Sequence, residues 1–235
     1  MARTKHRKPE THKPGTKDIL HSLEGEYQWL DLLKDKNKPY ESLINIVQRE
    51  GQKSEDDTSP NPSIKMIAEE INQSSAKVSQ WLAQMYHDLF DLDYQSPELF
   101  KSPGTRYELH FRSNFYEQSS FFTLWLDRTL QVKDRFEWSF MNAELGASYY
   151  YIYEITHSHA KGKLTTNVFL KSGYYNGYRE MLLSKSDFLE LMSFDERVHL
   201  NDYEVDQILR ERVEKGRDVS FERKKGRNYF KGNNW

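Results

Sequence analysis

The chain has 235 residues and a mass of 28.1 kDa, which is enough for one large domain or two small ones with their own hydrophobic cores. Hydrophobic residues make up 37% of the chain and aromatic residues 14%, which argues against a wholly disordered protein, and the absence of cysteine excludes disulfides, thiolate zinc sites and cysteine nucleophiles. No run approaches the roughly 18 apolar residues of a membrane span and residues 1–17 lack a signal-peptide core, so we expect a cytoplasmic protein.

The net charge of −2 conceals two basic ends around an acidic body. Residues 1–17 carry six Lys or Arg against one Glu, and residues 215–235 carry seven Lys or Arg against one Asp and one Glu. Basic ends favour contact with a polyanion, whereas two solvated flexible tails explain the same charges without any ligand.

Two amphipathic helices are predicted near the N-terminus. Apolar residues recur at helical spacing over residues 19–33 and again over residues 40–47. Residues 52–62 are acidic, lack apolar side chains and contain two prolines, which predicts an unusually long loop.

The most specific segment of the chain, residues 64–92, is typical of two further helices. One apolar stripe consists of Ile64, Ile67, Ala68 and Ile71, and a second consists of Val78, Trp81, Leu82, Met85, Leu89 and Leu92. Between the stripes, Asn72 tolerates a left-handed backbone, while Ser74 and Ser75 are candidate N-caps.

Over residues 64–82 this spacing resembles the helix-turn-helix motif of DNA-binding proteins. In that family a small residue lies in the first helix where the two helices touch, here Ala68, and a turn residue follows four positions later, here Asn72. Apolar residues hold the second helix, here Val78 and Trp81. The turn departs from the family pattern, which usually has glycine at the position of Asn72.

The resemblance implies that the second helix lies in the major groove of double-stranded DNA. Its candidate DNA contacts are Lys65, Gln73, Ser74, Ser75, Lys77, Ser79 and Gln80. Residues 63–82 contain two Lys and two Glu, so the motif neutralises little phosphate charge by itself. We therefore assign non-specific phosphate contacts to basic residues of the C-terminal tail, namely Arg223, Lys224, Lys225 and Arg227, with a disordered tail docked only by Trp235 as the alternative.

The second half of the chain is predicted to form a sheet. After a polar linker the apolar period changes from helical spacing to alternation, which predicts strands over residues 105–112, 120–126, 135–141, 148–159 and 163–171. The dipeptide Asn176-Gly177 predicts a hairpin turn. Ser193 and Glu196 have the spacing of a capping box, and a helix over 202–215 is expected to cover the sheet.

These elements predict an α+β fold with an N-terminal helical domain and a C-terminal antiparallel β-meander covered by a helix. The expected organisation is a basic disordered tail, a helical domain with the helix-turn-helix, a linker, a sheet-and-helix domain and a basic aromatic tail, with bounds of 1–17, 18–92, 93–104, 105–216 and 217–235.

Enzymatic chemistry has little support in the sequence. No phosphate-binding glycine loop, nucleophile elbow, zinc-protease helix or calcium loop is present, and no carboxylate pair is singled out by an apolar setting. His157 and His159 share one strand face, but two ligands do not make a metal site, so we expect no metal and no cofactor. An enzyme acting on nucleic acid ranks third among the hypotheses.

The predicted strands carry more aromatic surface than one helix can cover, which predicts a homodimer or a protein partner at the sheet. Tyr149, Tyr151 and Tyr153 share a strand face and are able to stack on bases, although no basic residue lies between them along the strand. The leading hypothesis is a DNA-binding transcriptional regulator. The alternative is an interaction or assembly module in which the helix-turn-helix is only a scaffold.

Overall fold

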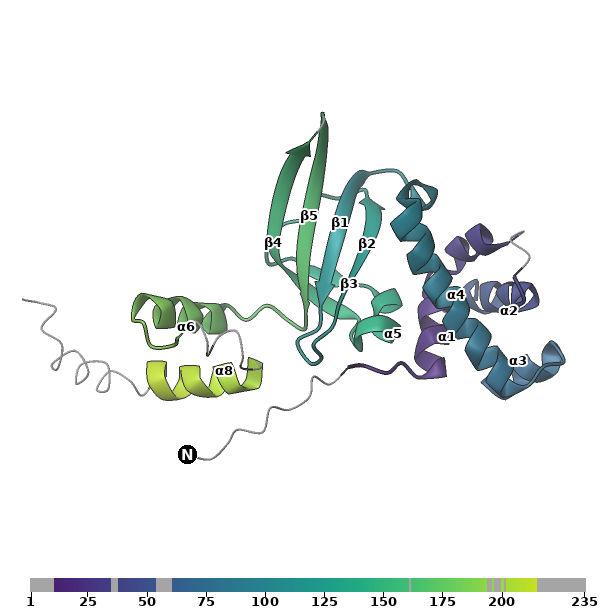
Figure 1. The fold of residues 1–235 in the computed structure, drawn as a ribbon, viewed down its shortest axis with the longest axis horizontal. Coiled ribbons are helices and arrows are strands. Elements are labelled where there is room, and N and C mark those ends of the chain that lie inside the picture. Colours follow the sequence, from purple (N-terminus) through teal and green to yellow (C-terminus); the bar gives the residue numbers. More distant parts are fainter. Residues whose placement is uncertain are drawn as a thin grey trace, which may run out of the picture. The chain divides into compact units, whose positions relative to one another are not determined.

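The computed structural model describes residues 11–34, 38–53, 61–160, 162–193, 196, 200 and 202–214 (Figure 1). The chain divides into two compact units, residues 1–175 and residues 176–235. The expected boundary at residues 93–104 therefore lies inside the first unit rather than between units.

The first unit begins with helices. Their bounds are Thr16–Gly25 (α1), Tyr27–Leu33 (η1, a 3-10 helix), Glu41–Gly51 (α2), Ile64–Glu70 (α3), Ser75–Gln95 (α4) and Pro97–Phe100 (η2, a 3-10 helix). The single helix predicted over residues 19–33 is wrong, because the α-helix ends at Gly25 and a 3-10 helix follows. Leu30 and Leu33 are both buried, and a helix of three residues per turn puts residues three apart on the same side.

A five-stranded sheet follows the helices. The strands are Thr105–Arg112 (β1), Ser119–Leu126 (β2), Arg135–Glu137 (β3), Tyr149–Ala160 (β4) and Lys163–Ser172 (β5), in the spatial order β2-β1-β5-β4-β3. The α+β class, with helices first and a sheet plus helix second, is confirmed. The sheet is not a simple meander, because β1 pairs with β5 in parallel while the other pairs are antiparallel. This parallel pairing aligns Leu109 with Val168 and Phe111 with Leu170, all of which are buried.

The strand predicted over residues 135–141 stops at Glu137. The chain then forms a short 3-10 helix, Ser139–Met141 (η3), and one turn of α-helix, Asn142–Leu145 (α5). Phe140 and Met141 are both fully buried, although they are neighbours in the sequence. A strand directs neighbouring side chains to opposite faces, so the helical turn is what allows both to enter the core.

One hydrophobic core joins the helices to the sheet. The Trp29 ring stacks on Phe122 of β2 with 5.2 Å between ring centroids, and the Phe140 ring lies 4.9 Å from that of Tyr86 in α4. The Tyr86 hydroxyl donates to the Phe140 carbonyl at 2.7 Å. The N-terminal helices thus cover one aromatic face of the sheet. The prediction was that the helix over 202–215 would cover it.

The end of α4 also binds the free edge of the sheet. Both carboxylate oxygens of Asp93 lie 3.1 Å from the backbone nitrogen of Thr123, which points out of the edge strand β2. A bonded edge N–H is no longer available for pairing with another chain. The residues predicted as a linker therefore include a structural contact between a helix and the sheet.

The second unit is helical. Its described residues form Gly177–Phe188 (α6), Asp202–Leu209 (α8) and Arg210–Glu214 (η4, a π-helix), and a buried cluster consists of Leu182, Met192, Val205 and Leu209. The hairpin predicted at Asn176-Gly177 is wrong, because the Asn176 side chain caps α6 by accepting from the Tyr178 and Arg179 nitrogens, each at 3.1 Å. Asparagine suits both a turn and an N-cap, so the dipeptide alone does not decide between them. The capping box is confirmed by reciprocal bonds between Ser193 and Glu196.

Among the residues that the structure describes, no helix is both long and apolar enough to cross a membrane.

The shared core predicts that the sheet does not fold without the helices. A fragment of residues 104–175 should lack a cooperative thermal transition, because Phe122 and Phe140 lose the ring contacts of Trp29 and Tyr86. A fragment of residues 11–175 should unfold in one transition. Circular dichroism melts compare the two, and a cooperative melt of residues 104–175 alone contradicts the shared core.

Candidate nucleic-acid interface

A tight turn joins α3 to α4 without a glycine. Asn72 adopts a positive φ of 53°, and the Gln73 nitrogen donates to the Ala68 carbonyl at 2.8 Å while the Asn72 nitrogen donates to the Glu69 carbonyl at 3.2 Å. This pair of bonds is the Schellman arrangement, which ends a helix through one left-handed residue. Asparagine at this position therefore performs the role of the usual glycine.

Serine side chains cap both helices. The Ser63 hydroxyl accepts from the Met66 nitrogen at 3.3 Å, and the Ser74 hydroxyl accepts from the Lys77 nitrogen at 3.2 Å. Ala68 and Val78 are buried where α3 and α4 pack, with exposed fractions of 3% and 0%. The helices, the turn and the small buried residue thus lie at the positions predicted from residues 64–82.

Five of the candidate contact residues are exposed around this turn. Lys65 lies on α3, and Gln73, Ser74, Ser75 and Gln80 lie at or next to the first turns of α4. Four backbone N–H groups at a helix start lack helical partners and carry partial positive charge, so this end of α4 is suited to a phosphate or a base edge.

The other two candidates on α4 are half-buried. The Lys77 ammonium lies 3.2 Å from the Gln80 side-chain oxygen and 5.5 Å from the Trp81 ring centroid. The Ser79 hydroxyl donates to the Ser75 carbonyl at 2.9 Å, so its only proton is already used within the helix. The tail candidates Arg223, Lys224, Lys225 and Arg227 lie outside the described residues.

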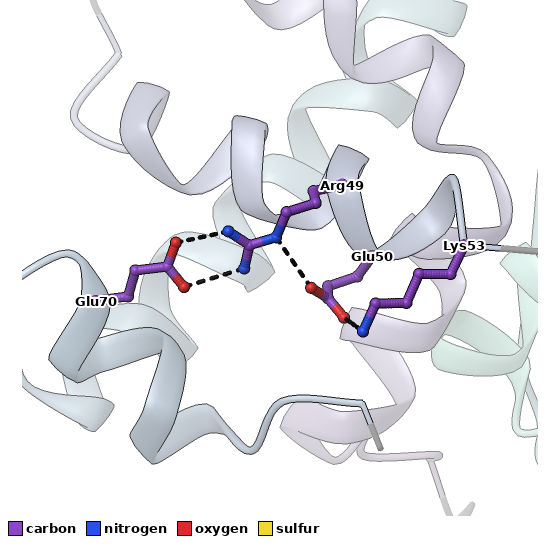
Figure 2. A network of polar contacts seen from close by, with 4 residues as sticks. All are labelled: Arg49, Glu50, Lys53 and Glu70. Atoms are coloured by element: carbon purple, nitrogen blue, oxygen red, sulfur yellow. Dashed lines mark hydrogen bonds and ion pairs between the residues drawn. The ribbon is translucent and has the colours of Figure 1, made fainter. Parts of the chain in front are cut away.

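An ion-pair network fixes α3 against α2 (Figure 2). The Arg49 guanidinium binds both carboxylate oxygens of Glu70, at 2.8 and 3.0 Å, and its Nε lies 3.1 Å from Glu50. Glu50 also pairs with Lys53. The bond to Arg49 lowers the pKa of the Glu70 carboxyl, so the pair stays charged at neutral pH.

Arg49 changes the charge of the candidate interface. The segment 63–82 has no net charge in the sequence, but Arg49 from α2 forms an ion pair with Glu70 and so neutralises one of its two carboxylates. Glu69 lies 3.8 Å from Lys65, which is an exposed and therefore weak pairing. Sequence reasoning missed Arg49 because no local pattern links the end of α2 to the end of α3.

A second feature is a cavity of about 410 Å³ at the junction of η1 and the sheet, lined by aromatic residues that include Trp29, Phe136 and Trp138. The Glu26 carboxylate lines it and accepts from the Trp138 indole nitrogen at 2.5 Å. Burial raises the pKa of Glu26 to about 7, and the Trp138 bond opposes this only in part.

Burial likewise raises the pKa of Asp93 to about 7. The expectation concerned a carboxylate pair, whereas the structure buries two single carboxylates, Glu26 and Asp93, that the sequence did not indicate. Although Phe90 and Leu92 precede Asp93, each carboxylate is bound to a residue distant in the chain, Thr123 for Asp93 and Trp138 for Glu26. Asp93 is bound to the backbone, and the second carboxylate that lines the Glu26 cavity, Glu137, pairs with Arg135 at 3.4 Å.

His157 and His159 lie near the exposed tip of β4. The His157 Nδ1 lies 3.1 Å from the Thr166 hydroxyl of β5, and both rings are exposed. In the part of the chain that the structure describes, no three His, Asp or Glu side chains are grouped to hold a metal ion.

Comparison of the chain with protein-family models, with curated proteins and with solved structures found no match.

The packing at the turn predicts the effect of enlarging Ala68. Ala68→Leu should lower the free energy of unfolding by about 1–3 kcal/mol, because three added carbons overfill the contact between α3 and α4. Ala76→Leu, at an exposed position on the first turn of α4, is the matched control and should leave stability within about 0.5 kcal/mol. Urea denaturation measures both, and equal stability of the two variants contradicts the packing.

The Glu26 cavity predicts a stability that falls as the pH rises. The Glu26 carboxyl keeps its proton up to about pH 7 in the folded protein, whereas it loses the proton near pH 4.5 in the unfolded chain. The contribution of Glu26 to the free energy of unfolding therefore declines as the pH rises between these two values. Glu26→Gln keeps an acceptor for Trp138 and should be more stable than the parent by about 1–3 kcal/mol at pH 8, with no gain at pH 4. Urea denaturation at both pH values tests this, and a pH-independent difference contradicts it.

Proposed function

We propose that the protein binds double-stranded DNA through the turn between α3 and α4 and the first turns of α4, as a transcriptional regulator does. The observation that carries the proposal is the division of α4 into two faces. Val78, Trp81 and Leu82 bury one face in the core, while Gln73, Ser75 and Gln80 remain exposed at its start.

The rigidity of this segment supports the proposal. Two serine caps and the Asn72 turn define the ends of both helices, and the Arg49–Glu70 pair holds α3 on α2. A preorganised helix end binds DNA without the additional cost of ordering its backbone. Glutamine and serine side chains have the donors and acceptors required to contact base edges.

The affinity from this surface alone is expected to be modest. The cations of this surface are Arg49, Lys65 and Lys77. Arg49 is paired with Glu70, and Lys65 lies 3.8 Å from Glu69. Phosphate neutralisation dominates DNA affinity, so the proposal assigns the remaining charge to the basic tail at 217–235. The assembly-module alternative needs no phosphate contact and therefore predicts no salt-dependent binding.

Salt-dependent DNA binding tests the proposal. Fluorescence anisotropy with mixed-sequence duplex DNA at 50 and 200 mM salt should show affinity that falls steeply with salt. Lys77→Ala should reduce the slope of log K against log salt by about 0.9, because one phosphate contact is lost. Gln73→Ala together with Gln80→Ala should reduce discrimination between duplex sequences.

The matched control is Lys101→Ala, which removes an exposed lysine that follows η2 and lies outside the proposed interface. It should leave the slope and the sequence discrimination unchanged. If the intact protein binds no duplex at 50 mM salt, the DNA-binding proposal is wrong.

A further inference from the structure

The outer face of the sheet is the side turned away from the N-terminal helices. On β1, Leu109 and Phe111 are buried against those helices, so His110 and Arg112 point to the other side. The outer sheet face includes residues from all five strands, namely His110, Arg112, Ser119, Phe121, Arg135, Tyr149, Tyr151, Tyr153, Phe169 and Lys171, together with the carboxylates of Glu108, Glu137 and Glu154.

Strand register aligns an aromatic row across three neighbouring strands. His110 of β1 is aligned with Phe121 of β2 on one side and with Phe169 of β5 on the other. The His110 and Phe169 rings stack with 4.7 Å between centroids and an angle of 15°, and the Phe121 ring lies 5.1 Å from His110. The three side chains are half-buried, so each ring retains exposed surface.

A cationic row runs beside the aromatic row, two residues further along each strand. The register aligns Ser119, Arg112, Lys171, Tyr151 and Arg135 in this order across the five strands. Three of the five are cations, and they come from β1, β5 and β3. The basic residues that are absent between the β4 tyrosines along the chain are thus supplied by neighbouring strands.

The cations lie over aromatic rings or stand exposed. The Lys171 ammonium lies 4.6 Å from the Tyr153 ring centroid, and the Arg135 guanidinium lies 4.8 Å from that of Tyr149. Arg112 is exposed and forms no ion pair with any residue that the structure describes. Glu137 pairs with Arg135 at 3.4 Å and Glu154 of β4 is aligned with Phe169, so Arg112 is the cation of this face to which a bound anion is assigned.

The two rows border a hollow of about 400 Å³. Its lining includes His110, Phe121, Phe169, Tyr153 and Arg112. This volume lies within the range of small-ligand sites, and its walls are aromatic rings with one guanidinium at the rim. A flat aromatic group is able to enter beside the rings while an attached anion contacts Arg112.

We propose that the outer sheet face binds single-stranded nucleic acid, with bases against Phe121, His110 and Phe169 and a phosphate on Arg112. Single strands offer both exposed base faces and a regular series of negative charges, and aromatic rings with interleaved cations match the two features. A duplex does not fit, because its bases are stacked on one another. A neutral apolar partner would leave Arg112 without a counter-charge.

Fluorescence anisotropy of the full-length protein with labelled dT12 and U12 tests the proposal. Both should bind at 50 mM salt, and the ratio of their affinities shows whether RNA or DNA is preferred. Phe169→Leu and Phe121→Ala should each weaken binding by about five-fold or more, because a stacking surface is lost. Arg112→Gln should reduce the salt slope by about 0.7, because one phosphate contact is lost.

Two matched controls accompany these variants. Tyr94→Ala removes a tyrosine of α4 that is 83% exposed, and Arg128→Gln removes an exposed arginine outside the face. Neither should change dT12 or U12 binding. The proposal is overturned if none of the three face variants changes binding, or if the two controls weaken binding as much as the face variants do. It is also overturned if the protein binds neither dT12 nor U12.

The test separates this site from the proposed duplex interface. Lys77→Ala should leave dT12 binding unchanged, and Arg112→Gln should leave duplex discrimination unchanged, since the residues lie on α4 and β1. Light scattering tests the alternative that a second copy of this chain, rather than a nucleic acid, binds to the outer sheet face. A dimer that Phe121→Ala converts to a monomer, without single-strand binding, assigns the face to self-association and overturns the proposal.

Discussion

The aromatic contact between the N-terminal helices and one face of the sheet is the interaction on which the rest of the structure depends. Trp29, Phe122 and Phe140 pack edge-to-face and face-to-face, and Tyr86 of α4 bonds to the Phe140 backbone. Because these rings close one side of the sheet, α4 is held in place along one of its faces, and the opposite side of the sheet keeps its polar and aromatic residues outside this core.

Closure of this core also encloses two carboxylates. Asp93 satisfies an edge nitrogen of β2, and Glu26 accepts from Trp138, so each has a structural partner. Burial nevertheless raises the pKa of each to about 7, which means that the fold stabilises the protonated forms. The contacts that join the helices to the sheet therefore make stability dependent on pH near neutrality.

The two proposed surfaces differ in how their charge is supplied. At the start of α4 the polar residues lie within one short segment, 73–80, that carries little net charge, and Arg49 is contributed by another helix. On the outer sheet face the aromatic and cationic residues come from all five strands, so the surface exists only when the sheet is assembled. The first surface suits contacts with base edges in a groove, and the second suits unpaired bases and a flexible phosphate chain.

The α+β class, the two helices around Asn72, the buried Ala68 and the alternation of β1 could all be predicted from the amino-acid sequence. These features depend on residues two to four positions apart, whose spacing alone places them on one face. Three features could not be predicted in this way: β5 lies beside β1, the core joins the helices to the sheet, and Arg112 is aligned with Lys171. Pairing between distant segments has no local signature, because it is selected by the burial of all the strands and helices at once.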